Sequence, residues 1–131
     1  MKSKKIGKIT RPANVKPEPH EEETARFLAN KLGFNIEFLE PVYQKGAHTP
    51  DIKMNNMFWE LKAPKGDAKH TIQHSLRKAL SQSKYVIFDL RRMKMPDNKA
   101  IAELKQKFEM VKIIKRILII TKSHILLDLK R

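Results

Sequence analysis

Asp51, Glu60 and Lys62 bring two carboxylates and one amine into a single short segment of the chain. Carboxylate oxygens are the ligands that hard divalent cations prefer, and Mg²⁺ is the usual candidate. The backbone carbonyl of Leu61 offers a third protein oxygen. A lysine beside such a cation can orient or deprotonate a water molecule, or hold a phosphate oxygen. These residue types together predict a Mg²⁺ or Mn²⁺ site suited to the hydrolysis of phosphodiester bonds.

The residues between these side chains predict the β-hairpin that would position them. Apolar and polar residues alternate on both sides of Asn55-Asn56, and asparagine tolerates the positive φ angles of a two-residue turn. Such a turn gives these pairs: Met54 with Met57, Lys53 with Phe58, Ile52 with Trp59, Asp51 with Glu60, and Pro50 with Leu61. The apolar pairs share one face. The two carboxylates lie opposite each other on the other face, with side-chain roots about 5 Å apart.

The same hairpin has a simpler interpretation. Antiparallel sheets often have one solvated, charged face, and two acids and a lysine on such a face need carry no chemistry. Like charges placed opposite each other are unfavourable unless a cation neutralises them, which favours the metal site. Spacing alone leaves both interpretations open. On the predicted faces Trp59 belongs to the core, whereas Phe58 is exposed and is the candidate for stacking on an unpaired base.

The hairpin lies within a pattern of alternating helices and strands. Hydrophobic periodicity predicts helices at residues 20–32, 71–81 and 97–110. The predicted strands cover residues 34–38, 50–54, 57–62, 85–90, 116–121 and 124–129. The element order is therefore αβββαβαββ, which is an α/β domain around one mixed sheet.

The composition indicates a polyanionic partner. The chain has 28 Lys and Arg residues against 14 Asp and Glu, a formal net charge of +14. Nucleic acid is the leading partner, ahead of an anionic membrane surface or an acidic inhibitor protein, and a merely solubilising basic surface is the simpler alternative. The absence of cysteine excludes disulfides, thiolate zinc sites and cysteine nucleophiles. The sequence has no apolar run typical of a membrane span or a signal peptide.

Residues 1–19 are predicted to form a flexible basic arm or linker, and residues 20–131 the folded domain. Basic residues and three prolines are interleaved in the arm, and no helical or strand period appears there. Such an arm adds phosphate contacts or acts as a spacer from a larger polypeptide.

The sequence resembles the PD-(D/E)XK nuclease superfamily. Pro50-Asp51, followed after eight residues by Glu60-Leu61-Lys62, is similar to its motif, and its core order αβββαβ fits residues 20–90. Within the superfamily, residues 20–129 resemble the C-terminal toxin nuclease domains of CdiA-type contact-dependent growth inhibition proteins. The resembling segments are EETARFLA (22–29), TPD (49–51), ELKAP (60–64), TI (71–72), QS (82–83) and FDLR (88–91).

The resemblance implies a metal-dependent nuclease, often acting on tRNA. It implies delivery into the cytoplasm of a target bacterial cell as part of a larger secreted protein. It also implies a cognate immunity protein, and an acidic one would suit so basic a toxin. By the family pattern Asp51, Glu60 and Lys62 carry the chemistry.

The resemblance further implies that a glutamate of the first helix joins the metal site. Glu21, Glu22 and Glu23 are the candidates. Glu22 is favoured because it lies three residues before Ala25, and Glu21 is nearly as good. Acids in a first helical turn also interact favourably with the helix dipole, which requires no catalytic role.

Other polar residues near the motif are candidates for supporting roles. The predicted phosphate-binding rim consists of Lys65, Lys69, Arg77 and Lys78, and His70 is a further candidate for a contact with substrate phosphate. His70 and His74 have a spacing that zinc sites use, but no glutamate lies between them as in metalloproteases, which favours a role facing solvent or substrate. For Asp89, near the end of a predicted strand, the sequence does not decide between a structural and a supporting role.

Two alternative functions fit the same sequence. A DNA endonuclease of the same superfamily, acting in repair, restriction or junction resolution, would use the same residues. A non-catalytic nucleic-acid-binding module would carry the carboxylates as surface charges, and its binding would be sensitive to salt but not to EDTA.

Overall fold

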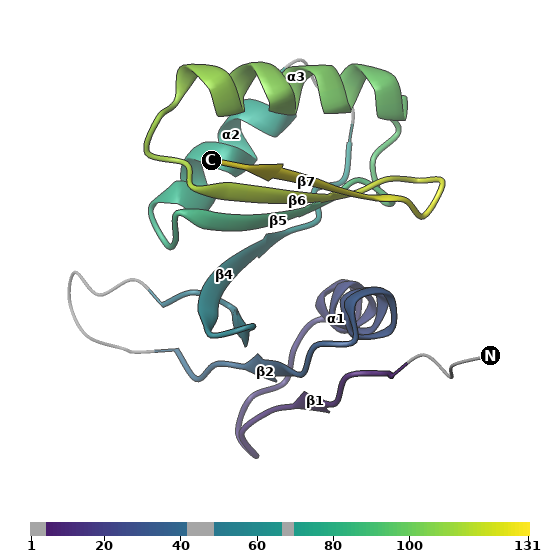
Figure 1. Ribbon diagram of the computed structural model, residues 1–131, viewed down its shortest axis with the longest axis vertical. Helices are drawn as coiled ribbons and strands as arrows, with labels where there is room; N and C mark the ends of the chain where they lie inside the picture. Colours follow the sequence, from purple (N-terminus) through teal and green to yellow (C-terminus); the bar gives the residue numbers. More distant parts are fainter. Residues whose placement is uncertain (1–4, 42–48, 67–69) are drawn as a thin grey trace. The chain divides into compact units, whose positions relative to one another are not determined.

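The computed structural model describes residues 5–41, 49–66 and 70–131, in which three helices and seven strands form a mixed α/β fold (Figure 1). The strands are hydrogen-bonded in sequence order, as one mixed sheet. The predicted order αβββαβαββ is confirmed, with one further strand before the first helix. The chain divides into two compact units, Met1–Trp59 and Glu60–Arg131. The boundary between them in the sequence falls within the strand Met57–Lys62.

The first unit contains β1 (Ile9–Thr10), α1 (Pro19–Leu32), β2 (Ile36–Phe38), β3 (Ile52–Met54) and the first half of β4 (Met57–Lys62). Strand β1 is parallel to β2, whereas β2–β3 and β3–β4 are antiparallel. The side chains of β2 and β3 alternate between buried and exposed, which is the pattern of a sheet with one covered face. The buried residues of this unit include Ala25 and Leu28 of α1 and Trp59 of β4.

Helix α1 begins and ends as its sequence dictates. Pro19 occupies the first turn, where its missing N–H costs nothing, and the Glu21 carboxylate accepts a hydrogen bond of 2.8 Å from the N–H of Glu18. Gly33 ends the helix in the left-handed conformation, with φ of 74°, and donates to the Ala29 carbonyl. The helix predicted at residues 20–32 therefore agrees with α1 to within one residue at each end.

The β3–β4 hairpin has the predicted turn and register next to it. Asn55 and Asn56 have φ of 53° and 63°, as a two-residue turn with two left-handed residues requires. The observed pairs are Met54 with Met57, Lys53 with Phe58, and Ile52 with Trp59. As predicted, Trp59 is buried and Phe58 is exposed.

Beyond these pairs the observed register departs from the predicted one. The N–H of Asp51 donates to the Trp59 carbonyl over 3.0 Å, although Ile52 is already the partner of Trp59. Two residues of one strand thus stand opposite one residue of the other, which is the arrangement of a β-bulge. The prediction that Asp51 is paired directly with Glu60 is therefore wrong. Pro50, which has no N–H to donate, ends the regular ladder at this point.

The second unit contains the rest of β4, α2 (Thr71–Leu80), β5 (Tyr85–Asp89), α3 (Asp97–Met110), β6 (Arg116–Ile120) and β7 (Leu126–Lys130). Strands β4, β5 and β6 are parallel, and β7 is antiparallel to β6. Helices α2 and α3 cover one face of this part of the sheet (Figure 1). Their apolar side chains form a core with alternate residues of the strands, including Val86, Phe88 and Ile117.

The first nineteen residues include a strand, β1, that the sequence pattern does not predict. The Lys8 carbonyl accepts a hydrogen bond from the Ile36 N–H, and the Lys8 N–H donates to the Asn35 side chain. The Gly7 N–H donates to the Ala29 carbonyl. A strand of two residues is too short to produce a detectable period, which explains the error. The boundary of the folded domain at residue 20 stays a prediction. No helix in the described part of the chain is long and apolar enough to cross a membrane.

Gly7 provides a test of how firmly this strand is attached. A Cβ atom at this position would lie 1.7 Å from the Phe34 carbonyl oxygen, so Gly7→Ala forces the backbone apart. We expect the free energy of unfolding in urea to fall by about 1–3 kcal/mol, with faster hydrogen exchange at the Ile36 amide.

Ile6→Ala is the matched control, because the neighbouring Ile6 side chain is 63% exposed. It should change stability by less than about 0.5 kcal/mol. Equal stability of the Gly7→Ala variant and the original protein would contradict the attachment of β1.

Candidate active site

Glu60 and Lys62 form an ion pair on strand β4. They are in register with Val86 and Phe88 of β5, so both side chains belong to the face of the sheet that α2 and α3 cover in this unit. The Lys62 Nζ lies 3.6 Å from Glu60 Oε2. Glu60 is only 6% exposed, and burial of a charged carboxylate is costly unless a cation lies near it. Lys62 supplies that cation. Between them, Leu61 is in register with Ile87, on the opposite face.

Asp51 lies in the first unit, at the bulge described above. Its carbonyl accepts a hydrogen bond from the Leu39 N–H, and its own N–H is bonded to Trp59, so neighbours on both sides hold its backbone. Bulges commonly re-aim a side chain next to a functional site. Asp51 lines a cavity of about 280 Å³ in this unit, together with Lys16, Glu21 and Glu40. Residues on three separate segments therefore surround Asp51 with both acidic and basic groups.

The same cavity distinguishes between the glutamates of α1. Glu21 lines it, whereas neither Glu22 nor Glu23 is among its lining residues, and Glu23 is exposed. The Glu21 carboxylate also accepts the capping hydrogen bond from Glu18, which limits its movement. Of the three acids, Glu21 is thus the one that shares a cavity with Asp51. The catalytic role of Glu22 stays a prediction without this support.

The oxygen donors of the predicted site are of the type that Mg²⁺ prefers. Among the described residues there is no group of three or more His, Asp or Glu side chains that could hold an ion. Mg²⁺ usually binds through one or two carboxylates and keeps several waters or substrate phosphate oxygens. Carboxylate and carbonyl oxygens, the donors that Asp51, Glu60 and Leu61 each offer, are ligands of the kind that Mg²⁺ accepts.

The predicted phosphate-binding rim is divided between several places. His70 precedes α2 and lines a cavity of about 670 Å³ with residues of α3, including Lys99 and Lys107. Arg77, on α2, lines another cavity of about 230 Å³. Lys65 is exposed, and Lys69 lies outside the described residues. The rings of His70 and His74 are stacked, with centroids 6.3 Å apart.

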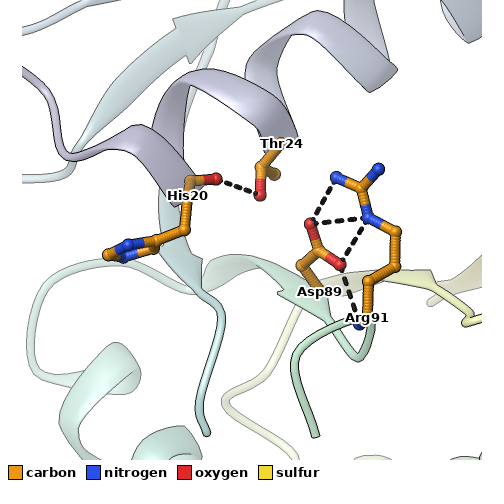
Figure 2. A network of polar contacts seen from close by, with 4 residues as sticks. All are labelled: His20, Thr24, Asp89 and Arg91. Atoms are coloured by element: carbon orange, nitrogen blue, oxygen red, sulfur yellow. Dashed lines mark hydrogen bonds and ion pairs between the residues drawn. The ribbon is translucent and has the colours of Figure 1, made fainter.

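Asp89 has a structural partner that the sequence pattern does not identify. Its carboxylate accepts hydrogen bonds of 2.8–3.2 Å from the guanidinium of Arg91 and one of 3.1 Å from the Arg91 N–H (Figure 2). The Asp89 side chain is 4% exposed. An acid followed two residues later by an arginine at a strand end was the available signal. Figure 2 also draws the hydroxyl of Thr24, which donates to the His20 carbonyl within α1.

Comparison with known proteins identifies the family. Residues 48–126, more than half of the chain, match the family described as the contact-dependent growth inhibition CdiA C-terminal domain. The chain belongs to this family. The matched segment of this CdiA C-terminal domain contains Asp51, Glu60 and Lys62, whereas α1 lies before it.

A solved structure has the same fold. The CdiA-CT/CdiI toxin and immunity complex from Burkholderia pseudomallei contains a chain with a TM-score of 0.68 and 17% sequence identity. The match covers 93% of this CdiA domain and 99% of that chain. No curated protein matches the sequence significantly.

The structural role of Asp89 can be measured with a double-mutant cycle. Alanine replacements of Asp89 and Arg91, singly and together, should give a coupling energy of about 1–3 kcal/mol in urea unfolding, because the pair is bidentate and its carboxylate is buried.

The pair of Arg116 and Asp128 is the matched control. It is also bidentate, and its hydrogen bonds raise the pKa of Arg116 although burial opposes this shift, but the Asp128 side chain is 42% exposed. Its coupling should stay below about 1 kcal/mol. Equal coupling in the two pairs would contradict a special structural role for Asp89.

Proposed function

We propose that this CdiA C-terminal domain is a metal-dependent endonuclease of the PD-(D/E)XK type, a toxin that hydrolyses phosphodiester bonds in RNA, with tRNA as its substrate. The observation that carries the proposal is the buried Glu60 beside Lys62. Glu60 directly follows Trp59, whose carbonyl accepts a hydrogen bond from the Asp51 N–H. A solvated hairpin face would not bury this carboxylate, so the simpler interpretation of the motif fits less well.

The carboxylates of Asp51 and Glu60, with the Leu61 carbonyl, would hold Mg²⁺. When bound, this ion lowers the pKa of water and stabilises negative charge on the phosphate oxygens. Glu60 would release part of its interaction with Lys62 as the cation binds. The Lys62 ammonium would then be available to a non-bridging phosphate oxygen or to the attacking water. The flexible four-carbon side chain of Lys62 would let its ammonium reach either group from a fixed backbone position on β4.

We assign the helix glutamate of the site to Glu21. Its place in the cavity beside Asp51 supports the assignment, and its capping hydrogen bond holds it in position. Glu21 would orient a water that binds beside Asp51, since a carboxylate accepts hydrogen bonds from water without having to contact the cation.

The partners follow from charge and family. A formal charge of +14 supports a polyanionic substrate, and the family resemblance supports tRNA. We propose a cognate immunity protein with an acidic surface as the second partner. The structural neighbour is part of a toxin and immunity complex, which supports this proposal. In this function the domain would be delivered into the cytoplasm of a target bacterium as part of a larger secreted protein.

The proposal is tested by incubating the protein with total tRNA, total RNA and plasmid DNA, each with Mg²⁺ or EDTA. We expect Mg²⁺-dependent cleavage of tRNA, reduced by about two orders of magnitude or more in Asp51→Asn, Glu60→Gln and Lys62→Met. Circular dichroism and urea unfolding establish that each variant is folded.

The other outcomes decide against the proposal in different ways. Cleavage of DNA alone would indicate that the same residues serve a repair, restriction or junction-resolving endonuclease. Absence of cleavage, with binding that depends on salt but not on EDTA, would identify a non-catalytic binding module. Full activity of the Glu60→Gln variant would contradict the assignment of the active site to Glu60.

A matched pair of variants tests the helix glutamate. Glu21→Gln removes a charge but keeps an oxygen that can accept the capping hydrogen bond, so the fold should be preserved. We expect its cleavage rate to fall by about 10- to 100-fold, and that of Glu23→Gln to change by less than about 2-fold. A larger loss of cleavage rate in Glu23→Gln than in Glu21→Gln would contradict the assignment to Glu21 and favour another acid of the first turn. Glu22→Gln would then be the next variant to measure.

A further inference from the structure

The sheet of the first unit has a row of exposed side chains across its four strands. Thr10 is in register with Glu37, Glu37 with Lys53, and Lys53 with Phe58. All four are exposed, whereas their neighbours Ile36, Ile52 and Trp59 are buried. Neighbouring strands lie about 4.8 Å apart, so this row extends over about 15 Å of sheet surface. We call these four residues, together with Lys8, the platform.

Phe58 is the unusual member of the platform. A phenylalanine side chain that is 49% exposed near the start of a strand gains little from folding, and its place in the row is fixed by the hairpin turn. The Nζ of Lys53 lies 5.9 Å from the centre of its ring. An aromatic face with a cation beside it is suited to a nucleobase and its phosphate, since each base can stack and each phosphate is an anion.

A depression next to Lys53 extends this surface. It has a volume of about 470 Å³ and is lined by Lys8, Phe34, Glu37, Lys53 and Asn56, among others. This volume is in the range of pockets that accept small ligands. Lys8 reaches this place because β1 is paired with β2, so the strand that the sequence did not predict brings a cation to the platform.

We infer that the platform binds a single-stranded segment of the RNA substrate, with a base stacked on Phe58 and phosphates near Lys53 and Lys8. The inference rests on the proposed function for the identity of the polymer. A single strand is favoured over a duplex because paired bases do not expose their faces to a side chain. In the sequence, the strand that carries Phe58 continues to Glu60 and Lys62.

Glu37 is negatively charged and lies on the same surface as the positively charged Lys8 and Lys53. Variants of Glu37 and Lys53 should therefore change the affinity for RNA in opposite directions. Lys53→Met removes a cation and should weaken binding of RNA. Glu37→Gln removes an anion and should strengthen it. A platform that does not contact RNA would give no such pair of opposite effects.

The test measures binding in EDTA, where the proposed cleavage does not proceed. The probes are fluorescent 12-residue oligouridylate and the same strand in a duplex with oligoadenylate, measured by anisotropy. We expect the single strand to bind more tightly than the duplex at the same salt concentration. Phe58→Leu, which keeps an apolar side chain but loses the stacking face, should weaken binding of the single strand by about 5- to 100-fold.

Two controls accompany this variant. Phe58→Tyr should keep the affinity, because tyrosine also has an aromatic face, and Ile125→Ala should leave it unchanged, because Ile125 is an equally exposed apolar residue of the second unit. Unchanged affinity in Phe58→Leu, or equal affinity for single strand and duplex, would overturn the platform. Because this experiment requires no cleavage, its result is independent of the nuclease test.

Discussion

The structure depends on the register of the β3–β4 hairpin, which the turn at Asn55 and Asn56 sets. A shift of one residue would move every side chain of β4 to the other face of the sheet. Trp59 would then leave the core, and Glu60 would change places with Leu61. Burial of Trp59, at 1% exposure, makes this exchange costly, so one large apolar side chain fixes the faces of the two charged residues that follow it.

The sequence was sufficient for this register because periodicity and turn chemistry agree in it. The same agreement made the element order and the bounds of β4 and α3 predictable. The bulge at Asp51 was not predictable, since it arises where Pro50 ends the ladder and β2 contributes a hydrogen bond from Leu39. Such hydrogen bonds come from residues distant in sequence. Strand β1 escaped prediction for a related reason, since Lys8 and Gly7 are held by partners near residues 29–36.

The candidate site was predictable in its residue types and only partly in its arrangement. The spacing of Asp51, Glu60 and Lys62 identifies two acids and a lysine, but it cannot distinguish Glu21 from Glu22, which lie 100° apart around α1. That choice depends on the segment 14–17 and the end of β2, which form the cavity around Asp51. Asp89 illustrates the same limit. Its partner is near in sequence, yet only the bend of the chain after β5 brings the Arg91 side chain back to it.

The ion pair of Glu60 and Lys62 explains how this fold can keep a carboxylate buried. A buried carboxylate without a counterion would destabilise the fold. A lysine two residues along the same strand lies on the same face, so β geometry alone places its charge near Glu60. An arginine would form a bidentate pair that is harder to break, whereas the single 3.6 Å contact of Lys62 can be exchanged for another ligand. The sequence Glu-Leu-Lys thus combines a buried acid with its own counterion, and the intervening Leu61 is buried on the opposite face of the sheet. In the proposed function the same lysine would also serve an anionic substrate.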